Sequence, residues 1–390
     1  MLENALIANG ASTEFAIDEE NAVQIAIVGG SLAGLFAATL LAGDGHKIAI
    51  YERSVHGLEG RGAGLLGKRD TFAVLRAAGC EHVARVGVVA RERIVFDRVG
   101  STVDSEMPPQ MQIPWDYLYR TFRNRVSNSY VLGRRVDRVR QDGDQVVVVF
   151  DDGGVEMADL AIGADGIASV VRASVDGSRA ANTYAGYVGW RGLLPERSLP
   201  AAAAGKLLER FAYFRMPRSH VIGFLVPGPR GETEVGARRY NWVWYRPAPG
   251  PAERDAALTD SDGRVHPYSL PPGAVSDRAR AALTEDAERL LPRPFADAIK
   301  ATDRPFVQGV FDYETENMVS GRIALAGDAA FVVRPHTGMG IAKAAGDAMS
   351  LRKHLLSRPA VEALQSYRDE RAPLGAAIAA SGRELGAQLS

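Results

Sequence analysis

The sequence predicts an α/β fold, and three observations predict it. Residues 23–52 read as a strand, a tight glycine turn, an apolar helix and a second strand. Residues 184–247 read as short strands separated by Pro, Gly and charged turns, and helical patterns return at 277–291, 294–302 and 338–390. A βαβ unit followed by antiparallel strands and then by helices indicates a mixed fold, in which one sheet is free to cover a cavity.

The βαβ unit has the spacing of a dinucleotide-binding turn. Strand residues IAIV run into a turn in which glycine fills the first and third places of G-x-G-x-x-G, while a small serine fills the second. The turn presents backbone N–H groups at a helix N-terminus, where the dipole favours a pyrophosphate, and the acid that ends the second strand can accept a ribose hydroxyl. No basic cluster replaces that acid, which argues against a 2′-phosphate; an ordinary buried βαβ unit is the alternative reading. The candidate contact residues are Gly29, Ser31, Leu32, Gly34, Glu52 and Arg53.

Composition excludes several classes of protein. The chain has 390 residues, 46% hydrophobic and 24% charged, so we expect a globular protein long enough for two domains. Its net charge of −1 creates no field that would attract nucleic acid or an anionic membrane, and no apolar run is long enough to span a bilayer. Cys80 is the single cysteine, which excludes an intrachain disulfide and a multi-cysteine metal cluster; we expect no metal and a cytoplasmic location. Residues 1–22 carry acids where a targeting signal would carry basic residues, and are expected to form a flexible extension.

The middle of the chain does not continue as a simple βαβαβ array. Segments 91–105 and 145–159 alternate like strands, and a DDGG turn joins the strands of the second segment. Between them, a helix is expected to start near Pro114, because apolar residues follow it at four-residue steps.

Two further motifs resemble the fingerprints of a known family. In Asp159–Arg172, DLAIGADGIASVVR, an apolar strand runs into Ala-Asp-Gly and a helix start. In Gly321–Ala348, an apolar strand ends at Gly-Asp, and a glycine-rich turn then precedes the start of a helix. Together with the N-terminal turn, these motifs resemble the three fingerprints of the class A flavin-dependent aromatic hydroxylases, which have the para-hydroxybenzoate hydroxylase fold. The resemblance spans about residues 23–370.

This resemblance implies the domain organisation. It predicts a Rossmann-like FAD-binding domain (GR2-type) with an interleaved antiparallel-sheet substrate domain and C-terminal helices. The expected parts are the extension 1–22, a first FAD-binding part with inserted strands over 23–182, a substrate domain over 183–304, and a second FAD-binding part with the C-terminal helices over 305–390.

Finer details resemble the 2,6-dihydroxypyridine 3-hydroxylase branch of that family. The matching stretches are TYAGYVGWRG at 183–192, RYNWVW at 239–244, and RPH followed by GIAKA at 334–344. The chain also departs from the wider family in the way this branch does. Ser31 replaces a glycine, Phe331 stands where a histidine is usual, and Trp115 stands near the place of a cofactor-contacting arginine.

The resemblance implies an FAD-dependent monooxygenase that consumes NADPH or NADH as a transient reductant and uses O₂. A flavin C4a-hydroperoxide would transfer oxygen to a hydroxylated aromatic N-heterocycle similar to a hydroxypyridine. A phenolic or uric-acid-like ring is an alternative, and a homodimer is plausible by resemblance. A halogenase, whose W-x-W motif Trp242 and Trp244 partly echo, and a non-catalytic flavin-binding protein are weaker alternatives.

Several residues acquire roles through the resemblance. Asp328 is expected to bind the ribityl hydroxyls, with a turn cap as the alternative. Arg61 and Val136 match positions that flank the adenosine half. Asp165 matches a position that handles both the flavin pyrophosphate and NADPH, although an Asp-Gly turn capping the next helix explains it equally well. The residues expected beside the isoalloxazine, near the N-terminus of a helix whose dipole would stabilise reduced flavin, are Gly338, Met339, Gly340, Ile341 and Ala342.

The substrate pocket should need only one or two polar groups in an apolar surround. The candidates are His336 beside the flavin loop, Tyr213 on a strand, and Trp190 as an apolar wall. A capping histidine is the alternative for His336, and plain sheet core is the alternative for the other two. Lys343 is expected to form an i,i+4 salt bridge with Asp347.

Overall fold

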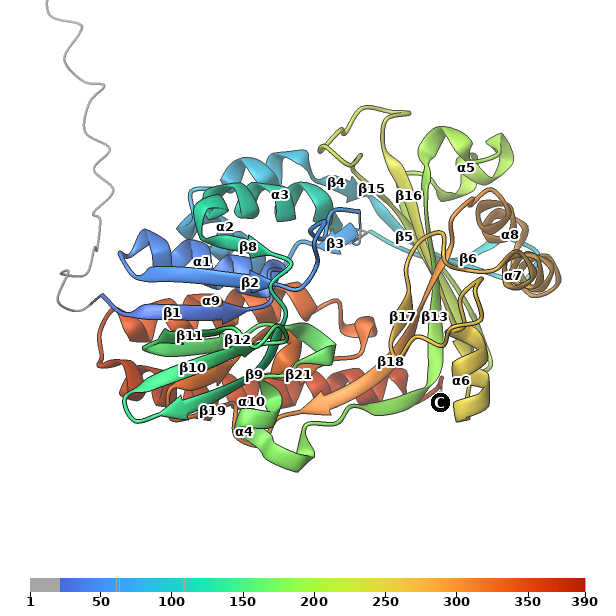
Figure 1. Cartoon of the computed structure of the whole chain (residues 1–390). Helices are drawn as coiled ribbons and strands as arrows, with labels where there is room; N and C mark the ends of the chain where they lie inside the picture. The colour runs from blue at the N-terminus through green and yellow to red at the C-terminus, as the bar shows by residue number, and fades with distance from the viewer. Residues whose placement is uncertain (1–21, 61, 63, 108–109, 390) are drawn as a thin grey trace, which may run out of the picture.

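The computed structural model describes residues 22–60, 62, 64–107 and 110–389, which form two sheet-centred parts that lie side by side (Figure 1). All of the predicted N-terminal extension except its last residue lies outside the described residues, as does Arg61.

The first part is built on a largely parallel sheet. Its central strands pair in parallel because β1 and β2 are joined through a crossover helix, α1 (Leu32–Gly43). One antiparallel strand, β19, extends the sheet at one edge. The strands, in spatial order, are β19 (Val319–Ser320), β20 (Ile323–Leu325), β12 (Leu160–Gly163), β1 (Gln24–Val28), β2 (Lys47–Glu52) and β8 (Tyr130–Leu132).

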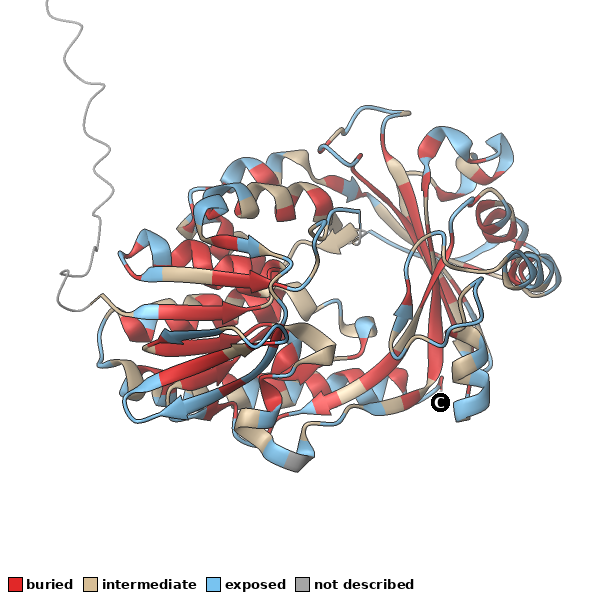
Figure 2. Ribbon diagram, in the orientation of Figure 1, coloured by how far each residue is buried: buried red, intermediate tan, exposed pale blue. Residues whose placement is uncertain are grey.

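Helices and a small meander enclose this sheet. Phe36 of α1 packs edge-on against Phe122, with the ring centroids 4.7 Å apart, and Tyr51 of β2 packs in the same way against Phe150 of the meander at 4.9 Å. These aromatic contacts belong to one continuous core (Figure 2). The enclosing elements are α2 (Arg69–Ala77), α3 (Trp115–Arg125), α4 (Arg172–Asp176), α9 (Gly340–Leu355) and α10 (Ala360–Gly386), with the meander β9 (Val136–Asp142), β10 (Gln145–Phe150) and β11 (Val155–Ala158).

The second part is a large, mostly antiparallel sheet of nine strands. In spatial order it contains β17 (Ser269–Leu270), β18 (Phe306–Glu314), β13 (Thr183–Pro195), β16 (Arg239–Pro247), β15 (Ser219–Val226), β14 (Arg210–Met216), β5 (Glu92–Phe96) and β6 (Thr102–Glu106), and β21 (Phe331–Val332) pairs with β18. A three-stranded sheet of β3 (Gly64–Leu66), β7 (Gln110–Pro114) and β4 (Val88–Ala90) lies between the two parts.

The outer face of the large sheet carries its own hydrophobic core. Trp242 and Trp244 are fully buried there, and their indole N–H groups donate to Thr302 Oγ1 and Ser219 Oγ, each at 2.9 Å. The partial W-x-W motif is therefore used for packing. The helices on this side of the molecule are α5 (Ala201–Leu207), α6 (Pro251–Ala257), α7 (Asp277–Leu290) and α8 (Arg293–Lys300).

Short 3₁₀ turns complete the connections. They are η2 (Glu81–Val86), η3 (Ser127–Ser129), η4 (Gly166–Ala168), η5 (Gly177–Arg179), η6 (Glu196–Ser198), η7 (Gly327–Ala329) and η8 (Pro335–Thr337).

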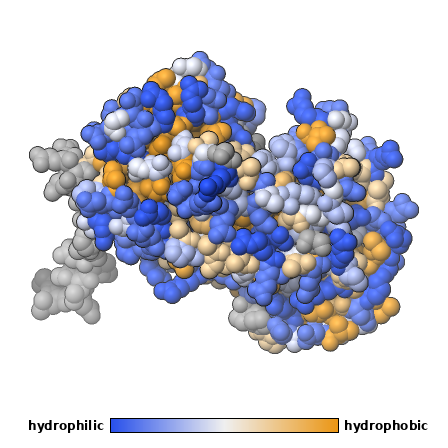
Figure 3. All heavy atoms as spheres, turned by 90° about the horizontal axis from the view of Figure 1, so that it is seen from below, coloured by the Kyte–Doolittle hydropathy of each residue, from blue (hydrophilic) through white to orange (hydrophobic). Residues whose placement is uncertain are grey.

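The predicted α/β class is confirmed, but two strand assignments differ from the sequence-based division. β5 and β6 lie in the large sheet and not with the first part, because β5 pairs in parallel with β14. β18 also joins the large sheet, beside β13, although the division at residue 304 assigned it to the second FAD-binding part. Seen from below, hydrophilic and apolar side chains are interspersed on the surface (Figure 3). No helix among the described residues is long and apolar enough to cross a membrane.

Candidate active site

Four loops meet at the carboxyl edge of the parallel sheet. They follow β1, β2, β12 and β20, whose parallel pairing brings their ends to one edge, the usual location of ligands in such sheets. Gly29 shows how tightly two of these loops pack. Its φ is +104°, and a Cβ there would lie 2.4 Å from the carbonyl oxygen of Ala164. Only glycine fits this position.

The N-terminus of α1 is open for an anion. Gly34 lets the helix approach the turn, since a Cβ there would lie 2.1 Å from the carbonyl oxygen of Gly29. Ser31 is the N-cap residue but makes no side-chain cap, and Leu32 begins the helix. The N–H groups of the first helical turn therefore have no intrahelical acceptor, which is the arrangement that binds a pyrophosphate.

Glu52 is placed beside this turn. Its side chain is 5% exposed, and its carboxylate accepts N–H bonds from Gly30 at 3.0 Å and Ser54 at 2.8 Å. A carboxylate has about four lone-pair sites, so it can still accept a ribose hydroxyl. Arg53 is exposed, and the side chain of Val136 is buried in the core, which leaves only its backbone to flank an adenosine.

Asp328 reaches the other side of the same helix N-terminus. Its neighbour Gly327 lies against α1, because a Cβ on Gly327 would be 2.7 Å from the Cβ of Ala33. Asp328 itself is 51% exposed, which leaves its carboxylate accessible to a ligand hydroxyl. Glu52 and Asp328 thus lie near the same glycine turn, at the N-terminus of α1. This placement allows the two carboxylates to bind different parts of one dinucleotide.

The predicted salt bridge between Lys343 and Asp347 is wrong. Asp347 accepts hydrogen bonds from the Gly327 N–H at 2.9 Å and from Arg371 at 2.8 Å. The Lys343 side chain is 1% exposed, and its Nζ lies 3.7 Å from an Asp328 oxygen without forming a hydrogen bond to any described residue. The i,i+4 spacing identified a possible pair, but a buried arginine from α10 takes the acid instead.

The glycine-rich turn before α9 exposes backbone. Gly338 has a φ of +59°, in the left-handed region, and Thr337 Oγ1 accepts the N–H of Met339 at 3.2 Å. Gly340 begins the helix, and a Cβ there would meet no atom within 4 Å, so the backbone is open to a ligand. Ile341 and Ala342 continue the first turn, whose N–H groups point out of the helix start.

Asp165 caps the segment that follows it. Its Oδ2 accepts the N–H of Val170 at 2.7 Å, as the local alternative predicts. Its Oδ1, however, is buried and has no partner among the described residues, and burial raises the pKa of this carboxyl. An acceptor left unpaired next to Gly29 is suited to a bound ligand.

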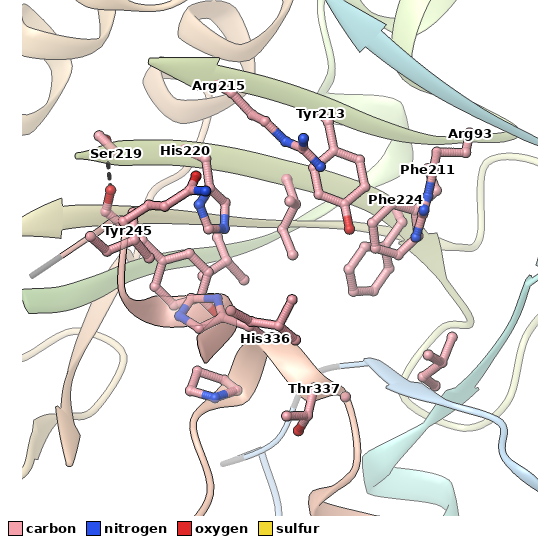
Figure 4. Close-up of a pocket in the computed structure, with 18 of the residues that line it drawn as sticks. Arg93, Phe211, Tyr213, Arg215, Ser219, His220, Phe224, Tyr245, His336 and Thr337 are labelled. Carbon is pink, nitrogen blue, oxygen red and sulfur yellow. Dashed lines mark hydrogen bonds between the residues drawn. The ribbon is translucent and has the colours of Figure 1, made fainter. Parts of the chain in front are cut away.

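A cavity of about 780 Å³ lies between the large sheet and the loops (Figure 4). Phe211 and Phe224 form a stacked pair on the sheet, 4.8 Å apart, and the opposite side is formed by the turn that contains His336 and Gly338. A second cavity of about 220 Å³ is lined by Asp328 as well as by residues of the sheet. The two cavities share four lining residues, which are Pro335, Val243, Tyr245 and Arg191. The loops of the first part and the inner face of the large sheet therefore form one site.

His336 lines the larger cavity, as expected for a residue that contacts the substrate. One ring nitrogen, Nε2, is 2.8 Å from the Tyr187 hydroxyl, and the rings of Tyr245 and His220 lie 4.4 and 5.3 Å away. Burial lowers the pKa of His336 to about 3, so its imidazole is neutral at neutral pH.

Tyr213 also lines the cavity, whereas Trp190 does not. The Arg93 guanidinium carbon lies 5.2 Å from the centre of the Tyr213 ring, and burial raises the pKa of this phenol. Trp190 is 7% exposed and packs in the core on the other face of the sheet, directly opposite Trp244 on the neighbouring strand. The expectation that Trp190 forms a pocket wall is wrong, because successive residues of a strand point to opposite faces.

The sequence reasoning missed the polar residue next to that tryptophan. Arg191 points to the inner face, together with Val243 and Tyr245 of β16. The signal was present in the alternation of the strands, since Trp190, Trp242 and Trp244 share the apolar face and Arg191 therefore falls on the other. Arg93 was missed because nothing in its local sequence shows that its strand enters this sheet. His220 lies on a strand that was predicted, and the sequence reasoning did not consider it as a pocket residue.

Known proteins match the chain over most of its length. Two family models match, described as "FAD binding domain-like" over residues 184–312 and "FAD binding domain" over residues 275–381. The 2,6-dihydroxypyridine 3-monooxygenase of Paenarthrobacter nicotinovorans is 32% identical over 84% of this chain and 81% of its own length. The 3-amino-4-hydroxybenzoate 2-monooxygenase of Streptomyces cremeus is 28% identical, over 93% of this chain and 86% of its own.

The solved structure of 2,6-dihydroxypyridine-3-hydroxylase from Arthrobacter nicotinovorans superimposes with a TM-score of 0.88 at 29% identity, covering 94% of this chain and 92% of that one. The loops around Gly29, Glu52, Asp328 and Gly340 fit the dinucleotide cofactor that such enzymes use. The chain therefore belongs to the class A flavoprotein hydroxylases, the FAD-dependent monooxygenases that act on aromatic rings.

Proposed function

We propose that this protein hydroxylates a hydroxylated aromatic N-heterocycle, similar to a hydroxypyridine, using O₂ and electrons from NADPH or NADH. The observation that carries the proposal is the shared site. Loops suited to FAD and a cavity large enough for a flat ring meet at Pro335 and Tyr245. The ring class is supported by the name of the relative that is 32% identical.

The cofactor would be held by residues of the first part. Glu52 would accept a ribose hydroxyl, the N-terminus of α1 would receive the pyrophosphate, and Asp328 would accept the ribityl hydroxyls. The turn at Gly338 and Gly340 would lie against the isoalloxazine. When bound and reduced, FAD would supply the two electrons that activate O₂, so that one oxygen atom of O₂ enters the ring and the other leaves as water.

The chain's own residues would bind and orient the ring. Phe211, Phe224 and Tyr245 offer flat apolar surfaces against which an aromatic ring can stack while water is excluded. His336 is neutral and can accept a hydrogen bond. In the tautomer in which the Tyr187 hydroxyl donates to Nε2, the Nδ1–H can donate to a ring oxygen, and this hydrogen bond favours the ionised, more electron-rich form of the substrate.

A phenolic ring is the second candidate. It is supported by the relative named for 3-amino-4-hydroxybenzoate, which matches over 93% of this chain. A uric-acid-like ring would use the same groups. NADPH or NADH would bind transiently, because the sequence contains no second glycine-rich phosphate turn for a permanent nicotinamide site. A homodimer and a cytoplasmic location stay predictions.

The experiment is a test of ligand-stimulated turnover. Purified protein loaded with FAD is mixed with NADPH or NADH in the presence of 2,6-dihydroxypyridine, 3-amino-4-hydroxybenzoate or urate, and products are analysed after reaction under ¹⁸O₂. We expect one ring class to accelerate oxidation of the nicotinamide and to gain one ¹⁸O atom. Tight FAD binding without stimulated oxidation by any ring would favour a non-catalytic flavoprotein, and a product that requires chloride would favour a halogenase.

A further inference from the structure

Lys343 is a buried cation beside the loops suited to FAD, and its donors are unused. Its side chain is 1% exposed, and its Nζ lies 3.7 Å from Oδ1 of Asp328 and donates to none of the described residues. Asp347, one turn further along α9, does not serve as its partner, because this acid binds the Gly327 N–H and Arg371. A buried ammonium without hydrogen bonds is costly, so these donors indicate a ligand.

The helix determines where this side chain points. Gly340 and Lys343 are three residues apart, so they share one face of α9, and side chains on a helix lean toward its N-terminus. The ammonium of Lys343 therefore reaches back toward the open turn at Gly340, on the side where Asp328 lies. It lies between the acid suited to the ribityl chain and the backbone suited to the isoalloxazine.

The other buried cation beside this loop is already engaged. The Nε of Arg172 donates to the carbonyl oxygen of Ala329 at 2.7 Å, and its Nη1 donates to Asn182 at 2.8 Å, so this arginine holds the loop itself. Lys343 makes no comparable contact among the described residues, and the carboxylate of Asp328 is half exposed. The charge of Lys343 is thus available to a bound cofactor.

Reduction of the cofactor creates the charge that such a cation would stabilise. A hydride from a reduced nicotinamide brings two electrons and one proton to FAD, and leaves one negative charge on the isoalloxazine. That charge resides near N1, which adjoins the ring nitrogen that carries the ribityl chain. A cation at the junction of chain and ring therefore interacts more strongly with reduced than with oxidised FAD.

We propose that Lys343 is a cofactor-binding residue that tunes the reduction potential of the flavin. Its ammonium donates to the edge of FAD where the ribityl chain meets N1, next to Asp328, and its charge favours the reduced, anionic cofactor. This inference rests on FAD as the cofactor, and not on the ring that the enzyme hydroxylates.

The test replaces Lys343 by methionine, which keeps a long apolar side chain and removes the charge. The midpoint potential of bound FAD is measured against a reference dye during slow reduction by xanthine and xanthine oxidase. We expect the preference for reduced over oxidised FAD to fall about tenfold, which lowers the potential of a two-electron couple by roughly 30 mV. The melting temperature of the FAD-free protein should be unchanged or higher, because an unpaired buried charge has been removed.

A matched control removes a positive charge from the exposed side of the same helix. The side chain of Lys353 is 64% exposed and pairs with Glu370, so Lys353→Met should leave the potential of the flavin unchanged. A second comparison introduces Lys343→Met into an Asp328→Asn protein. The potential should again fall by a similar amount, because the ammonium contacts the cofactor itself and does not act through Asp328.

Three results would overturn the inference. The first is a Lys343→Met protein whose preference for reduced FAD stays within about twofold of the unaltered protein. The second is a clear loss of folded structure in the FAD-free variant, since Lys343 would then be part of the core. The third is a shift in potential that disappears in the Asp328→Asn background. None of these readouts requires turnover, so failure of the proposed hydroxylation would leave this inference standing, and its own failure would leave the hydroxylation untouched.

Discussion

Replacement of Gly29 by alanine tests the packing of the dinucleotide turn. The added Cβ would lie 2.4 Å from the carbonyl oxygen of Ala164 and 2.7 Å from the Cα of Asp165, roughly 1 Å closer than such atoms pack. The residue would also keep a φ of +104°, which costs a non-glycine residue about 1–2 kcal/mol or more. Relief of the backbone clash adds about 1–3 kcal/mol. The expected loss in the free energy of unfolding is therefore about 2–5 kcal/mol.

The assay has two readouts and an internal control. Because the turn must move, the variant should also lose one or two N–H contacts to FAD, which lowers affinity by about 5- to 30-fold in a fluorescence titration. Gly43→Ala, in the same helix α1, adds a Cβ that meets nothing within 4 Å, and should be neutral or slightly stabilising in thermal unfolding. If Gly29→Ala behaved like Gly43→Ala in both readouts, the described packing of the turn would be wrong.

Three further predictions concern cofactor binding, pH and the sheet. Asp328→Asn keeps the shape of an accessible side chain but removes its charge, so FAD affinity should fall by about tenfold in the same titration. Burial lowers the pKa of His336 from 6.5 to about 3 and that of His220 from 6.5 to about 4. As the pH falls below 6.5, these histidines therefore take up protons in the unfolded chain before they do so in the folded protein. The free energy of unfolding decreases with falling pH until the folded-state pKa values are reached. His336→Asn should therefore make the melting temperature less dependent on pH between 6.5 and 4, and an unchanged slope would contradict the buried neutral imidazole. Trp190→Phe should destabilise the protein by about 1–3 kcal/mol in urea unfolding while ligand affinity is unchanged. A large change in the ligand Kd would mean that Trp190 does line the cavity.

The cofactor loops could be predicted from the sequence because their function depends on residues that are close together in the chain. A strand, a glycine turn, a helix and an acid at the end of the next strand occupy residues 23–52, and their structure follows from these neighbours alone. The helix that begins at Gly340 and the acid at Asp328 follow the same logic. The antiparallel strands over 184–247 were also predicted, from alternation and turn residues.

The cavity was less readable because its residues come from distant segments. The choice of Trp190 over Arg191 was an error of one residue along a strand. Alternation places these two side chains on opposite faces of the sheet, and the pairing with β16 puts Trp190 opposite Trp244 on the apolar face. Arg93 reaches the site because β5 pairs in parallel with β14, a contact over more than a hundred residues that no local pattern records. The partner of Lys343 was misassigned because Arg371, on another helix, binds Asp347.

A crystal structure with FAD and an aromatic ligand tests the central claim most directly. The account predicts one FAD per chain, with its adenosine ribose at Glu52, its ribityl chain at Asp328 and its isoalloxazine beside Gly340, facing the ligand in the cavity of about 780 Å³. An FAD bound elsewhere, or one whose isoalloxazine faced away from that cavity with the ligand in another place, would contradict it.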